Sequence, residues 1–162
     1  MAKIRNKKEQ TKNIIIKETS TYIDKYFWVI IPILTVIYFI LSKYSVGYYQ
    51  DDEIGHFVNA KKFWINPSVI LGNWPKPGYK IFLVLPSLIG FDAVSITNAF
   101  IAAVTVYFTY RLIKILKIEF AFFGALLLAF QPLFFDLSFR SYAEIFTALL
   151  FLLLIIVGQR SA

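Results

Sequence analysis

The sequence predicts an all-α membrane protein, with about four helices that cross the bilayer and amphipathic juxtamembrane helices in a first outer loop. Of the 162 residues, 58% are hydrophobic, whereas soluble domains contain about 45–50% apolar residues. The mean hydropathy is +0.63, and aromatic residues make up 19% of the chain. Aromatic rings serve as lipid-facing bulk and as anchors at the membrane–water interface. This composition favours a chain whose main solvent is lipid.

The basic residues are concentrated ahead of the first apolar run. The net charge is +7, and most of the excess lies in residues 1–25. Such a segment is typical of a cytoplasmic anchor that precedes a membrane helix and contacts anionic lipid. A nucleic-acid-binding protein would carry its basic residues on one face of a folded soluble domain, so nucleic acid is excluded as a partner. The chain has no cysteine, which excludes disulfides and thiolate chemistry.

The predicted spans follow from the apolar runs and from the charges at their ends. Basic residues before the first run, and Arg111, Lys114 and Lys117 after the second, mark cytoplasmic ends. We therefore expect an integral, multi-pass protein of the cytoplasmic membrane with its N-terminus in the cytoplasm. Lysines in the outer loop oppose this orientation, but the N-terminal segment carries more basic residues. Behind the basic segment 1–25, a transmembrane domain is expected over 26–162, with spans at 26–42, 93–113, 120–135 and 143–157 and an outer loop at 43–91.

The outer loop is predicted to contain two short helices. Residues 52–64 form one of them, because Phe57, Ala60 and Phe63 recur at helical spacing while the charged residues lie off this stripe. That pattern is typical of a helix lying along a membrane surface. The apolar run 81–89 is too short to cross a hydrocarbon core of about 30 Å, so we expect it at the surface or half-inserted.

In this topology the acidic residues gather in two outer segments. Asp52 and Glu53 lie in the first loop, and Asp136 and Glu144 lie in a short turn at 136–144. The spans are joined by short links and should pack as neighbours, so the two segments are expected to meet. Hard divalent cations take oxygen ligands and keep open positions for a substrate phosphate, which suggests a cation site. The alternative is that these acids simply favour helix N-termini.

Three short motifs follow one another along the chain: Asp52-Glu53-x-x-His56, Trp74-Pro75-Lys76-Pro77 and Arg140-Ser141-Tyr142-Ala143-Glu144. With the basic tail, the first span and the outer loop, they resemble the N-terminal part of the GT-C glycosyltransferases over residues 26–158. This superfamily includes protein O-mannosyltransferases and aminoarabinose transferases. The resemblance implies a prokaryotic membrane enzyme that transfers a sugar from a polyprenyl-phosphate donor to an acceptor on the extracytoplasmic face. It covers only the first part of a typical member, so we expect the chain alone to be inactive and to need further spans or a partner subunit.

The resemblance also implies roles for individual residues. Asp52, with Glu53 beside it, matches the catalytic acid of the first loop, which acts on the acceptor or holds a metal. Lys76 matches a lysine that meets the donor phosphate, and Arg140 corresponds to an arginine upstream of the second acid. At the donor site, Arg140 would bind phosphate through two hydrogen bonds. Glu144 stands where members of the superfamily have a second acid. Lys76 is followed here by Pro-Gly, whereas many relatives have Pro-Pro.

A cofactor cation (Mg²⁺, Mn²⁺ or Zn²⁺) would be held by Asp52 and Glu144 together with His56, which follows Asp52 at helical spacing. Each of these residues also has an explanation without chemistry. Asp52 would cap a helix, Lys76 would reach lipid headgroups, and His56 would be an interfacial polar residue. Arg140 and Glu144 would form an ordinary ion pair along one helix turn.

Three classes of function are left open. The first is the sugar transferase or a part of it, with membrane lipids, the lipid-linked donor and an unidentified acceptor as partners. The second is a non-catalytic membrane scaffold or partner subunit. The third, a small transporter subunit, would place ionisable groups in the middle of the bilayer, whereas the expected spans are almost free of charge there. Inside the second span, Asn98 is expected to bond to a neighbouring helix.

Overall fold

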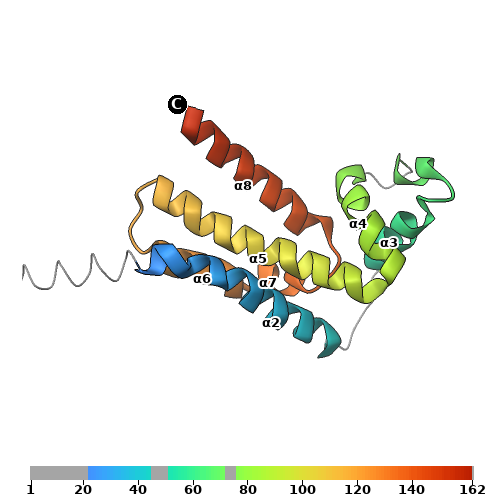
Figure 1. Ribbon diagram of the computed structural model, residues 1–162, viewed down its shortest axis with the longest axis horizontal. Coiled ribbons are helices and arrows are strands. Elements are labelled where there is room, and N and C mark those ends of the chain that lie inside the picture. The colour runs from blue at the N-terminus through green and yellow to red at the C-terminus, as the bar shows by residue number, and fades with distance from the viewer. Residues whose placement is uncertain (1–21, 45–50, 72–75, 162) are drawn as a thin grey trace, which may run out of the picture.

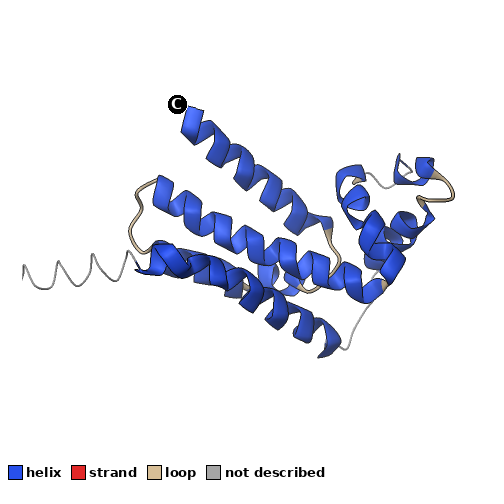
Figure 2. Cartoon of the chain, in the orientation of Figure 1, coloured by secondary structure: helices blue, strands red, loops and turns tan. Residues whose placement is uncertain are grey.

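The computed structural model describes residues 22–44, 51–71 and 76–161, and the regular structure of these segments is entirely helical (Figure 2). This confirms the predicted all-α class. In chain order the elements are η1 (Phe27–Val29), α2 (Ile30–Tyr44), α3 (Asp51–Lys62), η2 (Pro67–Leu71), α4 (Pro77–Ile89), α5 (Phe91–Ile115), α6 (Ala121–Phe130), α7 (Pro132–Ser138) and α8 (Ala143–Ser161).

Two of the described helices, Tyr22–Tyr44 and Phe91–Ile115, are long and apolar enough to cross a membrane. The pair α6 and α7, bent by 66°, makes a third candidate if the two helices cross together. α8 is also apolar, but it belongs with the shorter helices, over Ala143–Gln159. The chain is therefore a helical membrane protein with two or three candidate spans, where four were predicted.

α5 is the central helix of the bundle and contacts α2, α6 and α8 (Figure 1). Its buried face includes small residues such as Ala102 and Ala103. α6 buries Ala121, Ala125 and Ala129, which recur at every fourth position along one face. Small side chains let helix backbones approach closely, and close packing is a main source of helix association in membranes.

The predicted span 120–135 is not one straight helix. The chain breaks at Gln131–Pro132, because proline has no N–H to continue the helix and forces the preceding residue into an extended conformation. Two polar contacts compensate for the break. The Gln131 side chain accepts a backbone N–H bond at 2.6 Å in the first turn of α7, and the Tyr38 hydroxyl donates to the Ala129 carbonyl at 3.0 Å. α7 then extends into the segment that was predicted as a polar turn.

The bundle has two distinct ends (Figure 1). The described start of the first helix, the link between α5 and α6, and the C-terminal end of α8 lie at one end. α3, η2 and α4 lie at the other, beside the start of α5. Ion pairs join helices at both ends, from Asp24 to Lys114 at 2.9 Å at the first and from Lys43 to Asp92 at the second.

α3 and α4 pack against each other at this second end. α3 follows the predicted helix 52–64 but ends at Lys62, and its Ala60 is fully buried. α4 is longer than the predicted run 81–89, because Pro77 at its first turn has a backbone angle that suits a helix start. The outward face of α4 exposes a stripe of large apolar side chains: Ile81, Phe82, Leu85, Leu88 and Ile89.

Candidate functional site

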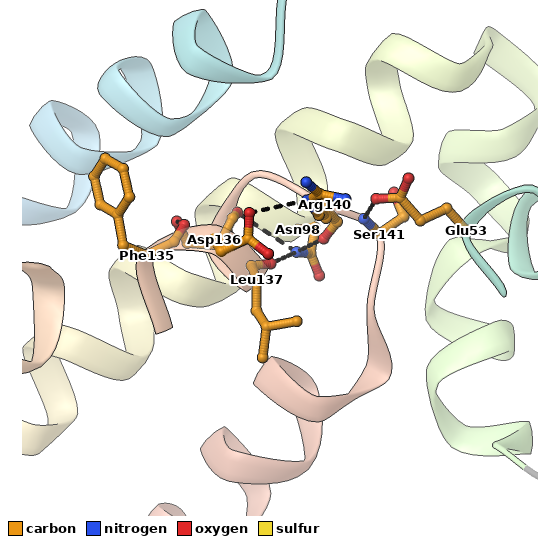
Figure 3. Close-up of polar contacts among 8 residues, drawn as sticks. Glu53, Asn98, Phe135, Asp136, Leu137, Arg140 and Ser141 are labelled. Carbon is orange, nitrogen blue, oxygen red and sulfur yellow. Dashed lines mark hydrogen bonds and ion pairs between the residues drawn. The ribbon is translucent and has the colours of Figure 1, made fainter. Parts of the chain in front are cut away.

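Glu53 joins the first loop to the link between α7 and α8. Its side chain projects from α3 and is 6% exposed, and its Oε1 accepts a hydrogen bond from the Ser141 N–H at 3.1 Å (Figure 3). Burial raises the pKa of the Glu53 carboxyl, while the Ser141 N–H and the charge of Arg140 act in the opposite direction. The two acidic segments that were predicted to meet are thus in direct contact, across 88 residues of sequence.

Lys76 and Glu144 form a second bridge between the same regions. The Lys76 Nζ, immediately before α4, lies 2.8 Å from Oε1 of Glu144 in the first turn of α8. The two side chains are 30% and 49% exposed, and ion pairs in contact with water contribute only about 0–1 kcal/mol. Another charged group could therefore replace either partner at small cost. Arg140 does not pair with Glu144 along the helix, since its Nε bonds to Oδ1 of Asp136 at 3.1 Å.

Asn98 of α5 holds both halves of this region in place. Its amide is fully buried, and Nδ2 donates to the carbonyls of Leu137, at 3.1 Å, and of Arg140 (Figure 3). Its Oδ1 accepts a hydrogen bond from the Tyr79 hydroxyl of α4 at 3.1 Å. The predicted bond from Asn98 to a neighbouring helix is confirmed. Its partners are the end of α7 and the first turn of α4, so one amide positions both segments that carry the site.

His56 is more enclosed than Glu53. The residue is 1% exposed, and its ring meets the Tyr79 ring edge-on with 5.3 Å between centroids. Within the described segments, neither ring nitrogen has a hydrogen-bond partner. Burial lowers the pKa of His56, the charges of Lys76 and Lys80 lower it further, and two nearby carboxylates act in the opposite direction. The imidazole is therefore neutral at pH 7.

Asp52 lies half-buried in the first turn of α3, and its charge acts on His56, as does that of Glu144. The three predicted metal ligands thus belong to one region. In the part of the chain that the structure describes, however, no three histidine or acidic side chains are grouped so that they could hold a metal ion. The cation site formed by Asp52, His56 and Glu144 stays a prediction.

Two residues of this region were missed in the sequence. Tyr79 is 2% exposed and Ser141 is 1% exposed, and both contribute polar groups to the contact between α3, α4 and the α7–α8 link. Tyr79 follows Lys76 by one helical turn, and Ser141 is next to Arg140. Proximity to predicted site residues was thus the available signal for both.

In chemical terms, one end of the bundle combines a half-exposed cation with carboxylates in unlike environments. A lysine can neutralise phosphate charge, and carboxylates whose surroundings differ can divide the roles of acid and base. Comparison of the chain with protein-family models, characterised proteins and solved structures gives no match. The resemblance to GT-C glycosyltransferases stays a prediction.

Proposed function

We propose that this chain forms part of a membrane glycosyltransferase of the GT-C kind. The enzyme would transfer a sugar from a polyprenyl-phosphate donor to an acceptor at the extracytoplasmic face. One observation supports this above the others: Asp52 and Glu53 of the first loop come together with Lys76 and Glu144 at a single end of the bundle. A transferase acting on a lipid phosphate needs such a combination of phosphate-binding cation and proton-accepting carboxylate.

The proposed roles follow from the environment of each group. Lys76 would exchange Glu144 for the donor phosphate, since their ion pair is open to water. Arg140, which is held by Asp136, would add a second cationic contact to the phosphate. Asp52 would accept the proton of the acceptor hydroxyl, while Glu53, through its bond to Ser141, holds α3 in place.

The proposal includes four crossings with the N-terminus in the cytoplasm. α2, α5, the pair α6–α7 and α8 would each cross once. α8 has 19 residues, and at about 1.5 Å per residue its length is about 28 Å, close to the hydrocarbon thickness of about 30 Å. The site would then face outward, on the side opposite to the link between α5 and α6.

Single cysteines can test this topology, because the chain has none of its own. Lys61 in α3 and Lys117 in the α5–α6 link are both exposed. In intact cells, a membrane-impermeant maleimide should label the Lys61→Cys variant and should reach the Lys117→Cys variant only after permeabilisation. The reverse pattern would place the site in the cytoplasm and would exclude the proposed reaction.

Donor binding tests the function itself, with the whole chain in lipid nanodiscs and polyprenyl-phosphate mannose as the probe. Lys76→Ala should weaken binding roughly tenfold or more, since a charge-assisted hydrogen bond contributes about 1.5–3 kcal/mol and 1.4 kcal/mol is tenfold. Lys117→Ala removes an exposed lysine from the other end and should leave binding unchanged. Equal effects of the two variants, or no binding by the unaltered chain, would favour the scaffold or partner-subunit function. Repeating the measurement with a chelator tests the predicted cation.

A further inference from the structure

Two buried polar side chains in the site lack hydrogen-bond partners among the described residues. They are the imidazole of His56, at both ring nitrogens, and the hydroxyl of Ser141, which lies near the Tyr79 hydroxyl without reaching hydrogen-bond geometry. Both residues are 1% exposed. Buried polar groups in folded proteins are nearly always hydrogen-bonded, so an unpaired set at a candidate site points to a bound molecule.

The two unpaired groups lie at the same contact between α3 and the α7–α8 link. Glu53 and His56 are three residues apart on α3, which places them on one helix face. Glu53 accepts the Ser141 N–H at 3.1 Å, so this face meets Ser141 directly. The Tyr79 ring stands edge-on to His56 and also lies beside Phe146, with 5.9 Å between ring centroids. The polar groups are thus bordered by aromatic rings.

The chemistry of these groups matches a hydroxyl. A neutral imidazole presents one N–H donor and one acceptor nitrogen. A hydroxyl can accept from the first kind of nitrogen or donate to the second, and the Ser141 hydroxyl has the same dual capacity. An anion can only accept hydrogen bonds, so it would leave the acceptor nitrogen of the ring unpaired.

The position of His56 near Lys76 and Glu144 indicates which hydroxyl-bearing molecule would fit there. Its ring lies within electrostatic reach of Lys76 and Glu144. In a polyprenyl-phosphate sugar the sugar is bonded directly to the phosphate, so a sugar ring would lie next to a phosphate bound at Lys76. We propose that His56 and Ser141 hydrogen-bond the hydroxyl groups of the donor sugar, while Lys76 binds its phosphate. This inference rests on the proposed function and assigns the sugar-recognising residues of the same site.

The experiment compares two lipids in nanodiscs that contain the whole chain: polyprenyl-phosphate mannose and the methyl ester of the same polyprenyl phosphate, which carries the same single negative charge but no sugar. The unaltered protein should bind the sugar-bearing lipid roughly fivefold or more tightly, as expected for two neutral hydrogen bonds. His56→Phe keeps a ring against Tyr79 but removes both nitrogens, and Ser141→Ala keeps the N–H that Glu53 accepts. Both variants should make the two affinities equal, and neither should lower the affinity for the lipid without sugar. Lys76→Ala should lower the affinity for both lipids by the same factor.

Thr147→Ala is the matched control for Ser141→Ala, because the Thr147 hydroxyl donates to the Ala143 carbonyl of its own helix. It should leave the preference for sugar unchanged. Thermal unfolding of His56→Phe checks the fold, and its midpoint should be no lower than that of the unaltered chain. If the unaltered chain binds both lipids equally, or if the His56 and Ser141 variants keep the preference, this inference is wrong while the proposed function stands. If neither lipid binds, both are wrong.

Discussion

The hydrogen bonds of Asn98 allow a quantitative test of how the site is held together. In Asn98→Leu an apolar side chain of similar size replaces the amide. The Tyr79 hydroxyl, in a residue that is 2% exposed, then loses its acceptor, and the Leu137 carbonyl loses a donor. An unsatisfied buried group costs about 1–3 kcal/mol, and a polar contact between membrane helices averages about 0.6 kcal/mol. Applying the first figure to the Tyr79 hydroxyl and the second to the Leu137 carbonyl, we expect a loss of about 1.6–3.6 kcal/mol in the free energy of unfolding.

The assay is unfolding by sodium dodecyl sulfate in mixed micelles, followed by tryptophan fluorescence. Thr97→Val is the control, because the Thr97 hydroxyl donates only within α5, to the Ala93 carbonyl at 2.7 Å. A double-mutant cycle of Asn98→Leu with Tyr79→Phe should give a coupling of about 1 kcal/mol, since the second change removes the unpaired hydroxyl. The reasoning is refuted if Asn98→Leu costs no more than Thr97→Val, or if the cycle is additive.

Three further predictions concern packing, pH and the helix break. Gly158→Ala should raise the free energy of unfolding by up to about 1 kcal/mol, because alanine has the higher helix propensity. Gly124→Ala should raise it less, because the added Cβ would lie 2.8 Å from the Cδ1 of Ile113. Equal gains for the two variants in the same unfolding assay would contradict this. Below the ordinary His pKa of 6.5 the unfolded chain takes up a proton that buried His56 does not, so acidification from about pH 7.5 to about pH 5.5 should destabilise the unaltered chain more than His56→Phe. Buried Glu53 has a raised pKa, so acidification affects stability through Glu53 in the opposite direction, but equally in the unaltered chain and in His56→Phe. If the stabilities of the two proteins change in parallel with pH, His56 is not the group responsible. Tyr38→Phe should cost about 0.6 kcal/mol by removing the donor to the carbonyl at the α6–α7 break, and an unchanged unfolding midpoint would show that this bond is not needed.

Several features of the fold were readable from local patterns. Residues 22–44 and 91–115 are long apolar helices in the structure, as predicted for the first and second spans. The helix predicted at 52–64 is present as α3. The break at Gln131–Pro132 was missed, although proline is visible in the sequence, because the apolar run was judged by composition and length. Composition and length do not take into account that Pro132 has no N–H to continue the hydrogen bonding of α6.

The partners of the charged residues were not readable in this way. Spacing along one helix turn offered an ion pair between Arg140 and Glu144 as the explanation without chemistry. The structure instead pairs Arg140 with Asp136 and Glu144 with Lys76. Lys76 and Glu144 are 68 residues apart. An ion pair in water is worth little in any one geometry, so the packing of α4 and α8 on α5 selects the partner. The burial of His56 likewise depends on the packing of α3 against α4, where its ring meets that of Tyr79.

The sequence by itself determined that this is a helical membrane protein, because the bilayer imposes apolarity and length on each spanning segment separately. It also determined which end of the chain is basic and which segments carry acids. Only the tertiary structure decided that α3 docks on the α7–α8 link through Glu53, that Asn98 fixes this link and α4, and that His56 is enclosed against Tyr79 of α4. Those contacts join residues far apart in the chain, and their geometry exists only once the helices have packed.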